Sequence, residues 1–136
     1  MLLAALFVYA GAVKAMRPDL FAIDVFGFDV VSWDVSLWIA HGLPWIEIAL
    51  GVALLLPTTR IIALRLGLAL LLGFTALLAW SVFRGLEGSC GCLGAGDGGL
   101  TDAIWRNGII ILVASALLYV EQRRRSRRSA VSNVAL

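Results

Sequence analysis

Charged residues are scarce in this chain of 136 residues. Asp, Glu, Lys and Arg make up 15% of it and hydrophobic residues 61%, whereas a soluble domain is about one quarter charged. The chain also has only one histidine, three prolines and two cysteines. This composition excludes an ordinary soluble globular domain, and we expect no nucleic-acid partner. It is the composition of one small membrane domain that lies in lipid.

Apolar runs organise the sequence into helices. A membrane-spanning helix needs about 20 apolar residues, a length that the second and third runs reach and the fourth nearly reaches. The first run is short, but it lacks the charged segment that precedes the core of a signal peptide, so we interpret it as a retained helix. We therefore predict an all-α, polytopic membrane protein, a bundle of four transmembrane helices within residues 1–122. The runs lie at about residues 1–16, 37–56, 61–83 and 103–121.

Arginines near the end of the chain predict the orientation. Cationic segments stay on the cytoplasmic side, so the basic tail, residues 123–136, is expected to be cytoplasmic, and we predict that it is disordered. Counting back through four spans places both termini in the cytoplasm. Residues 17–36 and 84–102 then face outward, and we expect the first of these loops to be a partly helical segment that caps the bundle. Gly67 and Gly73 are expected to allow close helix approach.

Both cysteines lie in the glycine-rich stretch GSCGCLGAGDGG, residues 88–99. On the outer side, a disulfide between Cys90 and Cys92 would persist, but its small ring would be strained and therefore labile. Gly91 leaves the sulfur atoms open to a partner, and Arg106, expected in the first turn of the last helix, would favour a thiolate. A purely structural clip would remove little loop entropy. Redox exchange is thus favoured over a structural disulfide, with a copper(I) site as a third alternative.

Lys14 and Glu47 are ionisable residues inside apolar runs. Such residues cost about 2.5–3.5 kcal/mol on insertion scales and usually face a partner or a cavity. Their opposite charges at similar depth on consecutive helices predict an ion pair. The pair could serve a proton path, a quinone headgroup site or a substrate pocket, or it could be a packing strut, and the sequence leaves these alternatives open. His41 is expected at the interface, where it is a candidate for proton transfer to the thiols.

Three segments together resemble the MauE branch of the MauE/DoxX redox-associated membrane proteins, over nearly the whole chain. They are YAGAVKAMRPDLF (9–21), LPWIEIALGVALLL (43–56) and CGCLG (90–94). The resemblance implies a four-helix bundle that supports the maturation of extracytoplasmic redox proteins together with a thioredoxin-like partner. It also implies that Cys90 and Cys92 are the exchanging pair and that Lys14 and Glu47 are intramembrane polar residues. The layout is similar to vitamin K epoxide reductase and DsbB, but those proteins carry a second cysteine pair.

These observations lead to one principal hypothesis and two rivals. The principal hypothesis is a membrane component of thiol–disulfide exchange that acts directly on a thioredoxin-like protein or on a maturing client. Whether it would act as an enzyme, a thiol–disulfide oxidoreductase, stays open, and a quinone is the one cofactor considered. The first rival is a non-catalytic assembly or anchor subunit of a redox complex with a structural disulfide. The second rival is a small metal-handling carrier.

Overall fold

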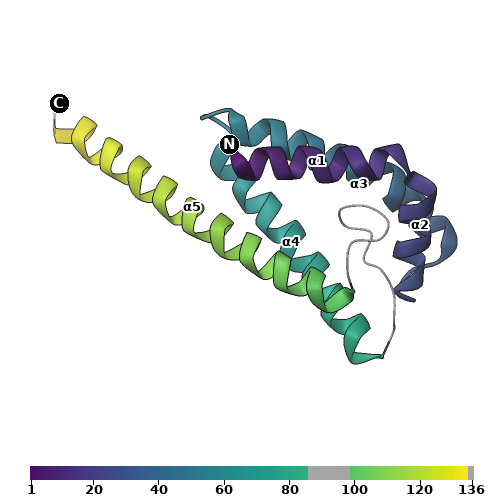
Figure 1. Ribbon diagram of the computed structural model, residues 1–136. Helices are drawn as coiled ribbons and strands as arrows, with labels where there is room; N and C mark the ends of the chain where they lie inside the picture. The colour runs from purple at the N-terminus through teal and green to yellow at the C-terminus, as the bar shows by residue number, and fades with distance from the viewer. Residues whose placement is uncertain (86–98, 135–136) are drawn as a thin grey trace.

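The computed structural model describes residues 1–85 and 99–134, and in these ranges the chain forms five α-helices (Figure 1). They are α1 (Leu2–Met16), α2 (Pro18–Gly27), α3 (Trp33–Leu55), α4 (Arg60–Phe83) and α5 (Leu100–Val134). The fold is therefore all-helical, as predicted. Three helices are long and apolar enough to cross a membrane, namely α3, α4 and residues 100–127 of α5, whereas α1 is apolar but shorter. The chain is a multi-pass membrane protein by these criteria.

Helix α2 forms half of the segment, residues 17–36, that the sequence placed between the first two apolar runs. Pro18 stands at its start, where a missing N–H is tolerated, and Asp19 in the first turn complements the helix dipole. Phe21, Ala22 and Val25 are buried and pack against Ala40 of α3. The expected helical cap is thus present, and it is attached to α3 by an apolar face.

Two helices are longer than the apolar runs indicated. Helix α3 begins at Trp33 rather than near residue 37, and Ser32 precedes it at the N-cap position. Helix α5 begins at Leu100 and continues to Val134, so the basic residues that were expected to be disordered are helical. The reason is that no glycine or proline follows Gly108, while arginine, glutamine and alanine favour helix. Hydrophobicity ends near residue 121, but helix propensity does not.

The helices pack in two groups, α1 and α2 against α3, and α4 against α5, with α3 and α4 joining the groups (Figure 1). Helix α1 runs antiparallel to α3 at very close range. A Cβ atom added at Gly11 would lie 2.6 Å from the carbonyl oxygen of Pro44, and one added at Gly51 would lie 2.6 Å from Cγ2 of Val8. These two glycines therefore let the backbones approach.

Polar contacts identify the two ends of the bundle. At one end, Arg60 and Glu121 lie 3.9 Å apart, and Arg125 Nη2 donates to the carbonyl oxygen of Pro57 at 2.6 Å. These contacts hold α5 against the turn between α3 and α4. At the other end, next to α2, Arg84 Nη2 lies 3.1 Å from Asp29 Oδ2, an exposed ion pair between the end of α4 and the segment after α2.

Candidate functional site

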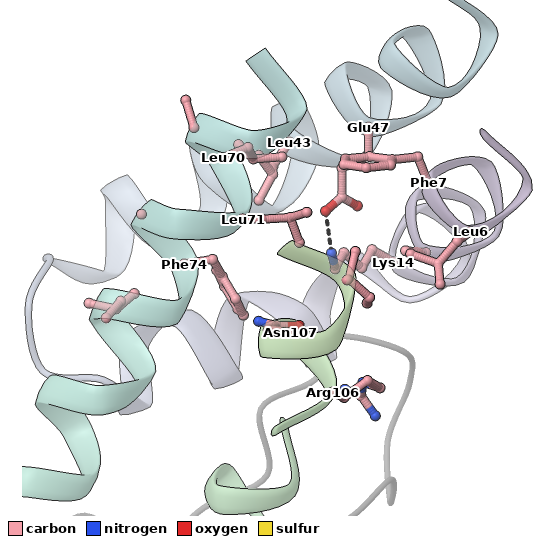
Figure 2. Close-up of a pocket in the computed structure, with 15 residues that line it drawn as sticks. Leu6, Phe7, Lys14, Leu43, Glu47, Leu70, Leu71, Phe74, Arg106 and Asn107 are labelled. Carbon is pink, nitrogen blue, oxygen red and sulfur yellow. Dashed lines mark hydrogen bonds and ion pairs between the residues drawn. The ribbon is translucent and has the colours of Figure 1, made fainter. Parts of the chain in front are cut away.

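A buried ion pair joins α1 to α3. Lys14 Nζ donates to Glu47 Oε1 at 2.6 Å, and the two side chains are 5% and 9% exposed (Figure 2). Gly11 precedes Lys14 by less than one helical turn, and a Cβ added there would lie 3.2 Å from Cβ of Glu47. The close approach of the helices thus brings the ammonium within reach of the carboxylate. The ion pair predicted from the two charges is confirmed.

Two aromatic rings complete the surroundings of the Lys14 ammonium. Nζ lies 5.3 Å from the ring centroid of Phe21 and 5.9 Å from that of Phe74. An ammonium over an aromatic face is attracted by the electrons of the ring, and the attraction is stronger where water is excluded. Because Phe21 belongs to α2 and Phe74 to α4, side chains of four helices meet at Lys14.

Only one of the two carboxylate oxygens of Glu47 has a hydrogen-bond partner among the described residues. Its Oε1 accepts from Lys14, but Oε2 is buried and has no hydrogen-bond partner among the described residues. A buried polar atom left without a partner costs about 1–3 kcal/mol, and more when the group is charged. Such an atom in a native fold calls for an explanation. One explanation is a partner that binds next to the carboxylate.

A cavity of about 380 Å³ lies beside this ion pair, between α1, α3, α4 and α5 (Figure 2). Its walls are mainly leucine, phenylalanine, isoleucine and alanine side chains. Four residues with polar side chains line it: Lys14, Glu47, Arg106 and Asn107. An apolar chamber with a few convergent polar groups is the usual form of a small-molecule site.

Asn107 is the polar residue that the sequence reasoning missed. It is 5% exposed, and its Nδ2 donates to Thr75 Oγ1 at 3.2 Å, while Thr75 Oγ1 donates to the carbonyl oxygen of Leu71 at 2.7 Å. These bonds connect α5 to α4 at the cavity wall. The signal was present in the sequence, because an asparagine inside an apolar run tends to bond across helices.

The other predicted residues are distributed differently. Arg106 lines the cavity from the second turn of α5 rather than the first, because the helix starts at Leu100 and not near residue 103. His41 is exposed, and its Nδ1 lies 2.8 Å from the carbonyl oxygen of Leu37 in its own helix. It lines a separate hollow with Asp34 and Trp38 and does not line the central cavity. Cys90 and Cys92 lie outside the described residues.

Comparison with known proteins gave one family. The sequence model of the family described as methylamine utilisation protein MauE matches residues 1–120. The matched range contains the cavity residues and both cysteines, and it ends before the arginines that begin at residue 123. No curated protein and no solved structure matched the chain.

Proposed function

The chain belongs to the MauE family, and from this membership we propose that it is the membrane component of a thiol–disulfide exchange system that matures an extracytoplasmic redox protein. The family description supports an accessory role in the membrane, in redox metabolism or methylamine utilisation. The finer proposal assigns the exchange to Cys90 and Cys92. The family match, which covers the only two cysteines of the chain, is the observation that carries it.

The anchoring of the neighbouring helix ends supports this proposal. Phe28, which follows α2, is buried in one apolar cluster with Leu78 of α4 and Leu100 of α5. The ion pair of Asp29 with Arg84 adds a polar contact at the same end. The chain therefore leaves α4 and enters α5 at fixed points beside α2. Both points lie at the end of the bundle opposite to Arg125 of α5.

The proposed topology follows from the distribution of charge. Four helices, α1, α3, α4 and α5, would cross the inner membrane of a bacterium, with the end that carries Arg60 and Arg125 in the cytoplasm. Helix α2 and residues 86–98 would then lie on the outer side. In that compartment disulfides form and persist, so exchange with a thioredoxin-like protein or a client is chemically favoured there.

The proposed chemistry is direct exchange. The thiolate of one cysteine attacks the partner's disulfide, a mixed disulfide forms, and the second cysteine displaces the partner's sulfur. Two thiols of this chain thereby lose two electrons and two protons, and the partner's disulfide becomes a dithiol. The same steps in reverse transfer a disulfide to the partner. With a single cysteine pair in the chain, no internal relay is possible.

Trapping of the mixed disulfide tests the proposal. Cys90→Ser and Cys92→Ser variants are expressed in cells that contain the client, and complexes are separated without reductant. We expect one of the two single variants to accumulate a reductant-sensitive complex with an extracytoplasmic protein. The Cys90→Ser/Cys92→Ser variant is the control and should trap nothing. Absence of any complex, together with normal client maturation in the double variant, would refute the exchange role.

A non-catalytic anchor or assembly subunit is the second candidate. The observation that favours it is helix α5, which continues past its apolar part with exposed arginines that another protein could contact. This candidate predicts a pair that resists mild reductant, with a reduction potential below about −300 mV. Exchange predicts a potential of about −120 to −270 mV. A thiol-alkylation titration of the pair against glutathione or dithiothreitol buffers separates the two candidates.

A further inference from the structure

We propose that the cavity between α1, α3, α4 and α5 binds the head ring of a lipid-soluble quinone or its quinol. This inference assigns a ligand to the cavity, gives no role to the cysteines and goes beyond the proposed function. It rests on the size of the cavity, the arrangement of its polar residues and the half-satisfied carboxylate of Glu47.

The cavity has the dimensions and walls of a ligand site. Its volume of about 380 Å³ lies within the ~300–1,000 Å³ usual for small-molecule pockets. Gly73 contributes to the open space, because a Cβ added at this position would meet no atom within 4 Å. A larger residue at position 73 could therefore project into the cavity without displacing the neighbouring helices.

The polarity of the walls changes along the bundle. On α1, the apolar lining residues Leu6 and Ala10 are followed by Lys14 near the end of the helix. On α5, Asn107 lies closer to the start of the helix than the apolar Ile110. On α1 and α5 the polar lining residues thus lie nearer the end next to α2 than the apolar ones, although on α3 the apolar Leu43 lies nearer that end than Glu47. A molecule with a polar ring towards α2 and an apolar tail in the hydrocarbon matches the arrangement on α1 and α5.

Hydrogen-bonding capacity selects the class of head group. Lys14 and Asn107 carry N–H donors for the carbonyl oxygens of a quinone. Glu47 Oε2 is an acceptor without a partner in the described part of the chain, and the hydroxyl of a quinol would supply the missing donor. A fatty-acid carboxylate offers only acceptors and would not donate to Oε2 of Glu47. The site therefore favours a head group that can both accept and donate.

Photolabelling with an azido-quinone tests the inference on the full-length protein in proteoliposomes. In the wild-type protein, we expect labelled peptides from the cavity-lining parts of α1, α4 or α5, and loss of labelling when decylubiquinone is added. Oleate at the same concentration is the competitor for a lipid head group and should leave the labelling unchanged. Labelling that maps elsewhere, or that oleate removes equally well, would overturn the inference.

Two leucine substitutions provide a matched pair. Gly73→Leu fills the cavity, whereas Gly108→Leu places the same side chain on α5 at a position that also has no atom within 4 Å of its Cβ but does not line the cavity. We expect labelling to fall about tenfold in Gly73→Leu, which corresponds to about 1.4 kcal/mol, and to stay at the wild-type level in Gly108→Leu. Equal labelling of the two variants contradicts the site. Thermal unfolding of both variants checks that they fold, and if Gly73→Leu does not, the mapped wild-type label decides.

Glu47 gives a second readout that depends on the redox state of the ligand. Glu47→Gln keeps the size of the side chain but replaces the charged acceptor by a neutral amide. Competition by decylubiquinol should weaken by about tenfold, because a hydrogen bond to a charged carboxylate is stronger than one to a neutral amide oxygen. Competition by decylubiquinone should change less, because its carbonyl oxygens do not donate to Glu47. If Glu47→Gln weakens competition by the quinol and by the quinone equally, Glu47 does not accept a hydrogen bond from the ligand. Failure of these binding tests would leave the cysteine exchange proposal untouched, because no thiol takes part in them.

Discussion

Lys14 and Glu47 each depend on the other inside the bundle. The carboxylate is the only acidic group that pairs with Lys14 in the described residues, and both side chains are almost entirely shielded. Removing one partner of such a pair leaves an uncompensated buried charge, whereas removing both leaves an apolar contact. Removing one partner should therefore lower the free energy of unfolding much more than removing both.

We predict that Lys14→Met destabilises the protein by about 3–5 kcal/mol, the usual effect of breaking a buried ion pair. Lys14→Met combined with Glu47→Leu should recover most of this loss. Unfolding in detergent, followed by circular dichroism, measures both variants. The exposed pair of Asp29 and Arg84 serves as the control, and Arg84→Met should cost at most about 1 kcal/mol. Additive losses in the double variant would show that Lys14 and Glu47 are not coupled.

The charges of the pair made it predictable, but its surroundings were not. A lysine and a glutamate in apolar runs stand out in any reading of the sequence, and their opposite signs suggest pairing. Phe21 and Phe74, in contrast, are two of six phenylalanines in an apolar chain. Nothing in their spacing indicates that they lie over the ammonium of Lys14. The roles of Asn107 and of the unpaired Glu47 oxygen likewise depend on how the helices are placed.

At the scale of helices, the contact between α1 and α3 depends on two small residues. Backbone oxygen atoms lie within 3 Å of the position that a Cβ of residue 11 or 51 would take. A side chain at either position could therefore not be accommodated by moving a flexible side chain alone. The sequence singled out Gly67 and Gly73 for this role. Gly67 does pack against the ring of Phe7, at 3.0 Å from an added Cβ, but the prediction for Gly73 was wrong because that residue borders the cavity.

We predict that Gly11→Ala and Gly51→Ala each destabilise the protein by about 1–3 kcal/mol, the usual range for overpacking. Gly42→Ala in the same helix α3 is the matched control, because an added Cβ there meets no atom within 4 Å. It should be neutral or stabilise the helix by up to about 1 kcal/mol. Thermal unfolding in one detergent compares the three variants. If Gly42→Ala is as harmful as Gly11→Ala, the close packing of α1 against α3 does not explain the effect.

Helix boundaries show where the hydrophobic pattern loses information. Apolar runs located the cores of α3, α4 and α5, since these helices are apolar on most sides. They did not give the start of α3 or the end of α5, because the flanking residues are polar and still helical. The helix propensity of the flanking residues, together with the absence of glycine and proline after Gly108, extends the helices beyond their apolar runs.

For the molecule as a whole, the sequence predicted four crossings, and the structure has three long apolar helices and the shorter α1. The helices nevertheless alternate in direction, and Met1, Arg60 and Glu121 border one common hollow. This arrangement places the start of the chain, the α3–α4 turn and the later part of α5 at the same end. If the helices α1, α3, α4 and α5 are counted together, an odd number of crossings would place the start of the chain and the later part of α5 at opposite ends.

Cysteine labelling measures the resulting orientation. On a Cys90→Ser/Cys92→Ser background, Ser32→Cys tests the end near α2 and Ser126→Cys tests the opposite end, both at exposed positions. In sealed spheroplasts, a membrane-impermeant maleimide should label Ser32→Cys fully and Ser126→Cys only after lysis. The reverse pattern would invert the topology. Equal labelling of both positions before lysis would mean that the two ends are not separated by the membrane.

The division of the helices into two groups has a mechanical consequence. Lys14 and Glu47 line the cavity from the group of α1, α2 and α3, and Gly73 and Asn107 line it from the group of α4 and α5. The short turn after Leu55 joins the two groups. The width of the cavity therefore depends on how these two groups are placed against each other. Phe28 and Leu100 belong to one apolar cluster at the end of the bundle opposite to this turn. Widening the cavity at Glu47 would therefore also disturb the contacts of Phe28 with Leu78 of α4 and Leu100 of α5.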